Sequence, residues 1–119
     1  MSEKTAYRLA TPERWAEVMM AGVFHGEAHD IADGFIHLSA AAQVEGTLVK
    51  HYNDHPRLLL AEIDLAALGE SVKWETSRGG EMFPHVYGDI PVSAVRGVRH
   101  IRRNEEGDWL LPTDLGSWT

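Results

Sequence analysis

The distribution of apolar and polar residues along the chain predicts a mixture of short helices and short strands. Residues 12–22 carry apolar side chains at helical spacing, with Thr11 as a good N-cap before them and Gly22 at the end. Residues 40–53 carry a second helical stripe, at steps of three and four. Alternating or continuous apolar positions predict strands at residues 6–10, 34–38, 57–65, 71–75, 98–103 and 108–111.

The order of these elements predicts an α+β fold, because strand–helix–strand units long enough for a doubly wound sheet are absent. About two helices and six strands are expected in a single domain over residues 1–119. Residues 23–33 show neither periodicity and are expected to form a solvated connection. Residues 92–95 are expected to form one helical turn, and residues 115–119 a short tail in which Trp118 docks.

The strand at residues 34–38 raises the first functional hypothesis. Its alternation places Ile36 and Leu38 on one face and Phe35, His37 and Ser39 on the other. If the aliphatic pair faces the core, His37 faces a groove beside Phe35. Two simpler interpretations stay open: a structural role for His37, and an N-cap role for Ser39 before the following helix.

The stretch W-E-T-S-R-G-G-E-M-F-P-H-V-Y-G, residues 74–88, concentrates the polar chemistry of the chain. Gly79 and Gly80 permit a sharp bend, and Pro84 restrains Phe83, so this stretch is expected to form a pre-organised binding loop after a strand with Trp74 inward. The alternative is a long hairpin loop whose aromatic residues cover the edge of the core. The side chains expected around a small polar ligand are Glu75, Arg78, Glu81, His85 and Tyr87.

Composition narrows the range of functions. The chain has 119 residues, a formal charge of −7, a pI near 5.4 and no cysteine, which excludes disulfides and thiolate chemistry. No run approaches the ~20 apolar residues of a membrane span, and a cytoplasmic location is the default expectation. The arginines of residues 96–103 are expected to protect an edge strand, and the net negative charge makes nucleic-acid binding unlikely.

The connection at residues 23–33 has a composition that a metal site could use. This segment contains His25, His29, Asp30 and Asp33, which are residue types that bind metals. Their spacing matches no helical zinc motif, and the segment is not expected to be helical. A solvated loop without a metal is therefore the prediction.

Two motifs together resemble a known bacterial family. D-G-F-I-H-L-S, residues 33–39, followed by the stretch at residues 74–88, resembles domain of unknown function 952. The resemblance covers nearly the whole chain. The family's fold is grouped with the ADP-ribosyltransferase-like domains, including RNA 2′-phosphotransferases that consume NAD, and this implies a small split sheet, antiparallel or mixed. H-L-S, residues 37–39, is similar to the strand whose histidine touches the NAD ribose in those enzymes.

The resemblance implies roles for individual residues. Glu81 or Glu75 would supply the carboxylate that an oxocarbenium-like transition state requires, and His37 would bind ribose hydroxyls. Arg78 would hold a pyrophosphate, or alternatively pair with one of these glutamates. Phe35 or Tyr87 would stack on nicotinamide. The remaining expected ligand-binding residues are Ser39, Trp74, Gly79, Gly80, Phe83 and His85.

Three functions remain open from the sequence, and whether the chain is an enzyme is one of the open points. The first is an enzyme that acts on NAD or an ADP-ribosyl group, with NAD as its cofactor or substrate. The second is a non-catalytic domain that binds a nucleotide or another small anion. The third is an enzyme on an unrelated small substrate that uses Glu81 and His85 as acid and base.

Overall fold

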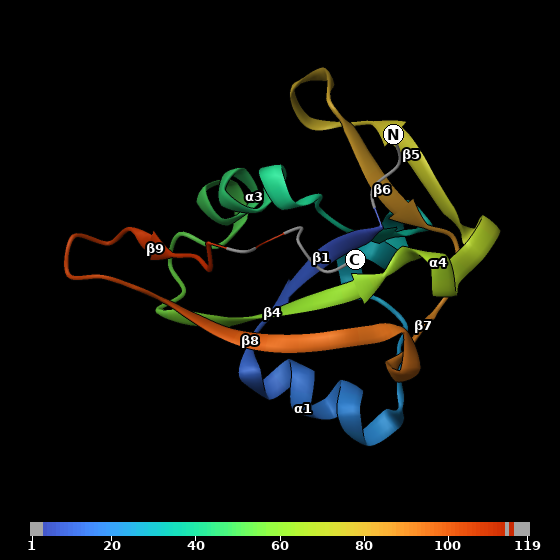
Figure 1. Ribbon diagram of the computed structural model, residues 1–119, viewed down its shortest axis with the longest axis horizontal. Helices are drawn as coiled ribbons and strands as arrows, with labels where there is room; N and C mark the ends of the chain where they lie inside the picture. Colours follow the sequence, from blue (N-terminus) through green and yellow to red (C-terminus); the bar gives the residue numbers. More distant parts are fainter. Residues whose placement is uncertain (1–3, 114, 116–119) are drawn as a thin grey trace.

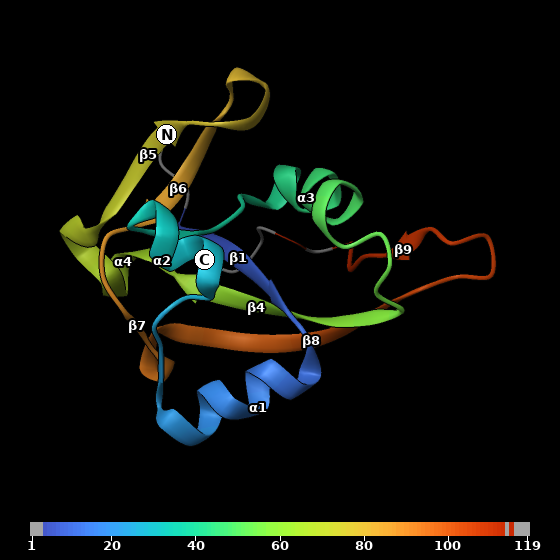
Figure 2. The ribbon, with the colours of Figure 1, turned by 180° about the vertical axis from the view of Figure 1, so that it is seen from behind.

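The structure is a computed structural model that describes residues 4–113 and 115, except for the side chain of Arg78. The described residues form short helices and antiparallel strands (Figures 1 and 2). The α-helices are α1 (Pro12–Ala21), α2 (Ala28–Asp33), α3 (Val44–His51) and α4 (Leu65–Leu68). The 3-10 turns are η1 (Ala41–Gln43), η2 (Gly69–Ser71), η3 (Arg78–Gly80) and η4 (Val92–Ala94). The strands are β1 (Thr5–Ala10), β2 (Val23–Phe24), β3 (Ile36–His37), β4 (Arg57–Asp64), β5 (Val72–Thr76), β6 (Met82–Val86), β7 (Ile90–Pro91), β8 (Val95–Arg103) and β9 (Trp109–Leu110).

The described strands form three sheets, two of which are joined by an isolated bridge. The largest has the order β1-β4-β8-β9, a second has the order β3-β6-β5, and β2 pairs with β7. A single antiparallel bridge between Tyr7 and Ser39 joins β1 to the second sheet, with N···O distances of 2.8 and 2.9 Å. Every pairing among the described strands is antiparallel, so the predicted α+β class with antiparallel sheets is confirmed.

β4 organises the core because its side chains are buried on both faces. Leu58 and Leu60 pack in the cluster that includes α3, whereas Leu59 and Ile63 pack in the cluster that includes α1. Figures 1 and 2 show these helices on opposite sides of the β1-β4-β8 sheet. The continuous apolar run predicted such a strand, and that prediction is confirmed.

The first helix follows the sequence signals at both ends. The Thr11 hydroxyl accepts a hydrogen bond from the backbone N–H of Arg14 at 3.1 Å. Gly22 ends α1 with a φ of 79°, a left-handed conformation that glycine adopts without strain. The N-cap and C-cap predictions are therefore confirmed.

The predicted connection at residues 23–33 is wrong, because it contains β2 and α2. The α2 part of the segment lacks apolar periodicity because its buried side chain is a charged one, Asp30. The predicted helix at residues 40–53 consists of η1 followed by the shorter α3. Ser39 does not cap it: Ala40 is the N-cap of η1, and Ser39 belongs to the bridge with Tyr7. The described chain thus has four α-helices and nine strands, more than the two and six expected.

The predicted binding loop at residues 74–88 is also wrong in form. It is a hairpin in which β5 and β6 pair from Val72 to Val86, and only a short turn separates them. Proline cannot donate a backbone hydrogen bond to a strand ladder. Pro84 is tolerated in β6 because it lies outside the ladder with β3, which pairs only with residues 85–86. Its carbonyl accepts a hydrogen bond from Leu38 N at 3.1 Å.

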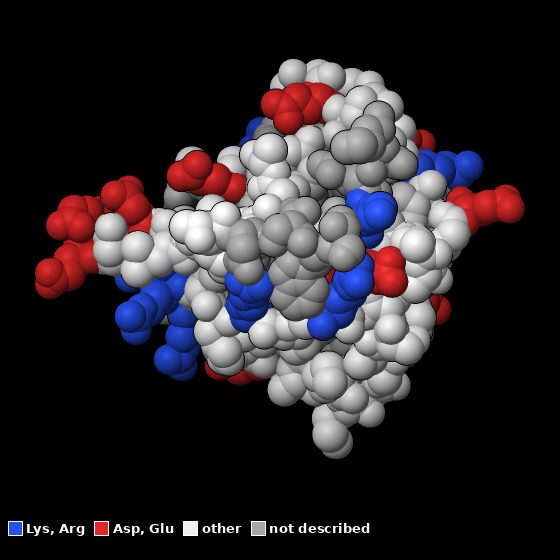
Figure 3. Space-filling model, in the orientation of Figure 1, with Lys and Arg blue, Asp and Glu red and all other residues white. Residues whose placement is uncertain are grey.

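Acidic and basic side chains are unevenly distributed over the surface seen in Figure 3. On the face in Figure 3, acidic side chains lie at the tip of the β8–β9 hairpin, and the lysines and arginines lie in separate groups. None of the described helices is both long and apolar enough to span a membrane. The predicted docking of Trp118 lies outside the described residues.

Candidate functional site

A cavity of about 780 Å³, called the cleft below, lies along the edge of β1 that faces the β3-β6-β5 sheet. Tyr7 and Ser39, the bridge residues, line it together with the backbone that continues along β1 to Thr11. Its volume is within the ~300–1,000 Å³ typical of small-molecule sites. Its polar lining residues are Tyr7, Arg8, Thr11, Glu27, His29, Asp33, His37, Ser39, Thr47, Lys50, His51, Tyr52, His55, Ser77 and His85.

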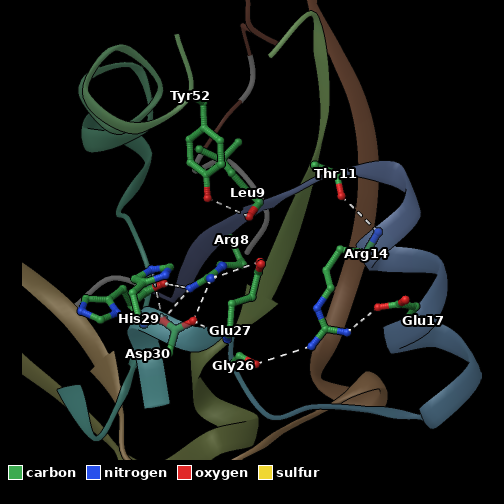
Figure 4. A network of polar contacts seen from close by, with 11 residues as sticks. Arg8, Leu9, Thr11, Arg14, Glu17, Gly26, Glu27, His29, Asp30 and Tyr52 are labelled. Carbon is green, nitrogen blue, oxygen red and sulfur yellow. Dashed lines mark hydrogen bonds and ion pairs between the residues drawn. The ribbon is translucent and has the colours of Figure 1, made fainter. Parts of the chain in front are cut away.

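A buried ion pair between Arg8 and Asp30 lies in the cleft wall, where Arg8 is a lining residue (Figure 4). Arg8 donates from Nη1 to Asp30 Oδ1 at 2.9 Å and from Nη2 to Oδ2 at 2.8 Å, and the side chains are only 4% and 1% exposed. The Arg8 guanidinium also lies 5.0 Å from the centre of the Phe24 ring. This two-point geometry offsets part of the cost of removing both charges from water.

Asp30 uses its remaining lone pairs to hold the neighbouring chain. It accepts hydrogen bonds from Glu27 N at 2.7 Å, His37 N at 2.9 Å and His37 Nδ1 at 2.7 Å. Burial acts to raise the pKa of Asp30, but the hydrogen bonds from His37 and Arg8 outweigh it and hold that pKa far below its usual value. Asp30 therefore stays ionised and ties β1, α2 and β3 together.

His37 is held by a carboxylate at each ring nitrogen. Nδ1 contacts Asp30 Oδ1, and Nε2 contacts Asp33 Oδ2 at 2.9 Å. The hydrogen bond to Asp30 raises the pKa of His37 above its ordinary value, although partial burial opposes the shift. A carboxylate at each nitrogen favours the imidazolium form of His37 and fixes the ring in the cleft wall.

His85 lies directly opposite His37 in the β3–β6 ladder and also lines the cleft. Its Nδ1 lies 2.7 Å from Glu75 Oε1, and the same oxygen accepts the Tyr87 hydroxyl at 2.8 Å. The hydrogen bond from His85 lowers the pKa of Glu75, so the carboxylate is ionised. Phe35 stacks on the His85 ring with centroids 4.0 Å apart and restricts its rotation.

Hydroxyl groups line the wall beside α3. The Thr47 hydroxyl donates to Gln43 O at 3.0 Å, so its oxygen is the acceptor for Ser39 Oγ at 2.8 Å. The Tyr52 hydroxyl points toward β1 and donates to Leu9 O at 3.4 Å (Figure 4). Burial raises the pKa of Tyr52, which therefore remains a neutral donor.

The basic and acidic side chains that line the cleft come from different elements. Lys50 and His51 come from the end of α3, and His55 follows in the next turn. Glu27 and Asp33 come from the start and end of α2. The cleft thus has basic side chains from α3 and the turn after it, and carboxylates from α2.

The structure brings some of the predicted site residues into the cleft and leaves others outside its lining. His37, Ser39, Gly79, Phe83 and His85 line the cleft. The predicted residues outside the lining are Phe35, Trp74, Glu75, Gly80, Glu81 and Tyr87. The side chain of Arg78 lies outside the described part of the structure.

The two candidate glutamates have different surroundings. Glu75 contacts the cleft residue His85, so it acts on the cleft through that histidine. The Glu81 carboxylate accepts a 3.3 Å hydrogen bond from Gln43 Nε2, which joins the β5–β6 hairpin to η1.

Sequence reasoning missed the ion pair and the lining residues of α3. Arg8 is one polar residue in an apolar strand, and its partner is 22 residues away, so no local pattern connects them. A weak signal existed in the sequence, because Arg8 interrupts the apolar strand predicted at residues 6–10, and in the structure all six residues of β1 are buried. An arginine at such a position requires a buried carboxylate.

One group of side chains has the composition of a metal site. Ligand atoms of His29, Asp30 and His37 lie within 4.8 Å of one another. Both Asp30 oxygens, however, accept hydrogen bonds from the Arg8 guanidinium, and a metal ion there would lie beside that cation. The geometry favours an ion-pair network over a metal centre.

Comparisons with known proteins give a family and a solved relative. The model of the family described as "Protein of unknown function (DUF952)" matches residues 9–98. The crystal structure of protein CC0527 from Caulobacter crescentus is 37% identical, with a TM-score of 0.84 over 90% of this chain and 94% of that chain. Its solution structure is 38% identical, with a TM-score of 0.78 over 87% and 90%. A search among curated proteins gives no match.

Proposed function

The chain belongs to the DUF952 family, whose description assigns no activity, and we propose from the cleft itself that it binds a phosphate-bearing small molecule of nucleotide size. NAD and ADP-ribosyl compounds are the first ligand class to test. The cleft would take the ribose and phosphate groups against its polar wall. Turnover is a separate property that binding alone does not require.

The observation that carries this proposal is the buried Arg8–Asp30 ion pair, which is hydrogen-bonded to His37. A buried two-point ion pair, Arg8 with Asp30, orients a side chain that is 29% exposed and lines a cavity of about 780 Å³. Burying such a pair opposes folding through desolvation, and a structural histidine would not require it. Pre-organised polar groups in a concave site are a general feature of ligand binding.

The distribution of charge supports a phosphate-bearing ligand. Lys50 supplies a cation from α3, and the side chains of His51 and His55 lie at the end of α3 and in the turn after it, while the cation of Arg8 is already neutralised by Asp30. Ser39 and Thr47 add hydroxyl groups beside them. Cations and hydroxyls together are the groups that bind phosphate oxygens.

The choice of NAD and ADP-ribose as first ligands rests on the resemblance of the H-L-S strand at residues 37–39 to the ribose-binding strand of ADP-ribosyltransferase-like domains. His37 would contact ribose hydroxyls at the side of the cleft that carries Glu27 and Asp33. These two residues are the carboxylates of the described lining, and they are nearer candidates than Glu81 for a developing positive charge. Glu75 would contribute through His85.

Isothermal titration with NAD, ADP-ribose and nicotinamide tests the proposal. NAD and ADP-ribose are expected to bind, and Lys50→Ala is expected to weaken both by about tenfold because one charged phosphate contact is worth about 1.4 kcal/mol. Lys73→Ala is the matched control, since Lys73 is an exposed lysine of β5 outside the cleft lining. Absence of binding heat with all three compounds, or equal effects of the two lysine variants, would overturn the proposal.

A further inference from the structure

The strongest chemical feature beyond ligand binding is a pair of histidines with opposite hydrogen bonding. His37 and His85 are direct partners in the antiparallel β3–β6 ladder, with ring centroids 5.6 Å apart. Both line the cleft. Because they lie on neighbouring strands, their relative position is set by the sheet rather than by a mobile loop.

One ring nitrogen of His85 is hydrogen-bonded to a carboxylate, and the other is available to a ligand. Nδ1 lies 2.7 Å from Glu75 Oε1, so it carries the proton and donates to this carboxylate. The Tyr87 hydroxyl and the stacked Phe35 ring hold the arrangement in place. Among the described residues, Nε2 has no hydrogen-bond partner, and in the neutral ring it carries the lone pair. A carboxylate that fixes one nitrogen in this way prepares the other as a base.

His37 has the opposite arrangement, because a carboxylate lies at each ring nitrogen and the protonated ring donates to both. Asp30 is buried and tied to Arg8, so it retains its hold on Nδ1. Asp33 is 55% exposed and lines the cleft, so a ligand oxygen can replace it at Nε2. The proton on Nε2 is then directed at that ligand.

We propose that His85 and His37 are the general base and general acid of a hydrolase that cleaves a nucleotide phosphodiester in the cleft. His85 Nε2 takes a proton from water, the water oxygen forms a bond to phosphorus, and the phosphorus bond to the departing ribose oxygen breaks. His37 Nε2 gives its proton to that oxygen, which leaves as a hydroxyl. A diester and water yield a monoester and an alcohol, with no further reactant. Glu75 is a positioning residue that acts through His85.

Two considerations select this substrate class. Nicotinamide leaves its glycosidic bond as a neutral molecule and needs no proton, whereas an alkoxide leaving group does, so the acid is explained by an oxygen leaving group. The cation of Lys50 lines the same cleft and favours an anionic phosphate centre. The inference rests on the proposed function only in that both require a nucleotide-sized phosphate ligand.

The test follows hydrolysis of 2′,3′-cyclic AMP by the full chain with ³¹P NMR, together with binding of the same compound by calorimetry. His85→Gln and His37→Gln are each expected to reduce kcat by about 10²- to 10⁴-fold with binding retained. Glu75→Gln is expected to reduce kcat by about 10- to 100-fold with little change in KM. His25→Gln is the matched control, because His25 is 63% exposed, contacts Asp89 and lies outside the cleft lining.

The outcomes separate the two proposals. A wild-type chain that binds ADP-ribose or cyclic AMP but does not hydrolyse the cyclic phosphate overturns the acid–base inference and leaves the binding proposal intact. Release of nicotinamide from NAD with the cyclic phosphate untouched has the same consequence. Full activity in His85→Gln also overturns the inference, and circular dichroism of each variant checks that lost activity is not lost folding.

Discussion

Asp30 is the residue on which the local structure of the cleft depends most. Its carboxylate accepts five hydrogen bonds, from two Arg8 nitrogens, two His37 nitrogens and the Glu27 backbone. Each of these residues comes from a different part of the chain, so a single side chain fixes β1, β3 and the start of α2. The sequence indicated His37 but not this support, because ion pairs between distant segments leave no periodic signal.

Removing Asp30 therefore has a large predicted cost. Asp30→Ala leaves the Arg8 guanidinium buried without its partner and is expected to lower the free energy of unfolding by about 3–5 kcal/mol. Asp33→Ala, which removes a carboxylate that is 55% exposed, is expected to cost about 1 kcal/mol or less. Urea denaturation of both variants measures the difference. Similar costs for the two would contradict the central place of the buried pair.

The pairing of His37 also predicts a pH dependence of stability. Because the hydrogen bond to Asp30 raises the pKa of His37 in the folded state, its contribution is complete below the unfolded value near 6.5 and is lost as pH rises through the raised pKa. The pKa of Asp30 is lowered, so its contribution is present above about 3.8 and is lost only as pH falls below that value.

The measurement compares the melting temperatures of the wild type and His37→Gln from pH 4.5 to 9. The advantage of the wild type is expected to be greatest from about pH 4.5 to 6.5, where both groups are charged, and to shrink as pH rises further. An advantage that grows with pH above 6.5 would show that His37 is stabilised in its neutral form instead.

At the scale of elements, a glycine in the left-handed conformation lies on each side of α2. Gly26 has a φ of +96°, and a Cβ built on it would lie 2.8 Å from Asp30 Cβ. Gly34, at the other end of α2, has a φ of +88° but no atom within 4 Å of such a Cβ. The two glycines therefore share the left-handed conformation and differ in the space available.

This difference yields a matched pair of substitutions. Gly34→Ala is expected to lower the free energy of unfolding by about 1–2 kcal/mol through backbone strain alone. Gly26→Ala is expected to cost more, because it also pushes on Asp30 and disturbs its bonds to Arg8. Thermal denaturation compares the variants. A smaller loss for Gly26→Ala would mean that the turn relaxes without moving Asp30.

Sequence patterns predicted the elements that follow simple periodicity and failed where polar groups are buried. α1, with its Thr11 cap, and the continuous strand β4 were predicted because capping and apolar runs are local signals. α2 was missed because its buried member is Asp30, and β6 was interpreted as part of a loop because polar side chains, including His85, surround Pro84 in the sequence. Both failures occur at the candidate site, where tertiary contacts replace apolar periodicity.

At the scale of the whole molecule, β4 couples two core clusters across one sheet. Leu60 belongs to the cluster with α3, and Ile63 to the cluster with α1, and both are fully buried. Leu60→Ala and Ile63→Ala are each expected to cost about 2–5 kcal/mol, according to how far the cavity collapses. Far-ultraviolet circular dichroism and tryptophan fluorescence should report one coincident transition in each variant. Separate transitions would show that the two faces unfold independently.

The cleft follows from the whole architecture, since it lies where two antiparallel sheets are joined by the Tyr7–Ser39 bridge. The motif at residues 33–39 pointed to this region, and His37, Ser39 and His85 all line the cleft. The contribution of α3 was not predicted because Thr47, Lys50 and His51 are ordinary surface residue types on a helix. Only the folded arrangement places them across from β1.

The most direct test of the central claim is amide chemical-shift mapping of ¹⁵N-labelled protein during titration with ADP-ribose. Binding in the cleft predicts saturable shifts concentrated at Arg8, His37, Ser39, Thr47 and Tyr52, with little change along β8 and β9. Shifts confined to the β8–β9 hairpin, or no shifts at millimolar ligand, would contradict the assignment of the cleft as a nucleotide-binding site.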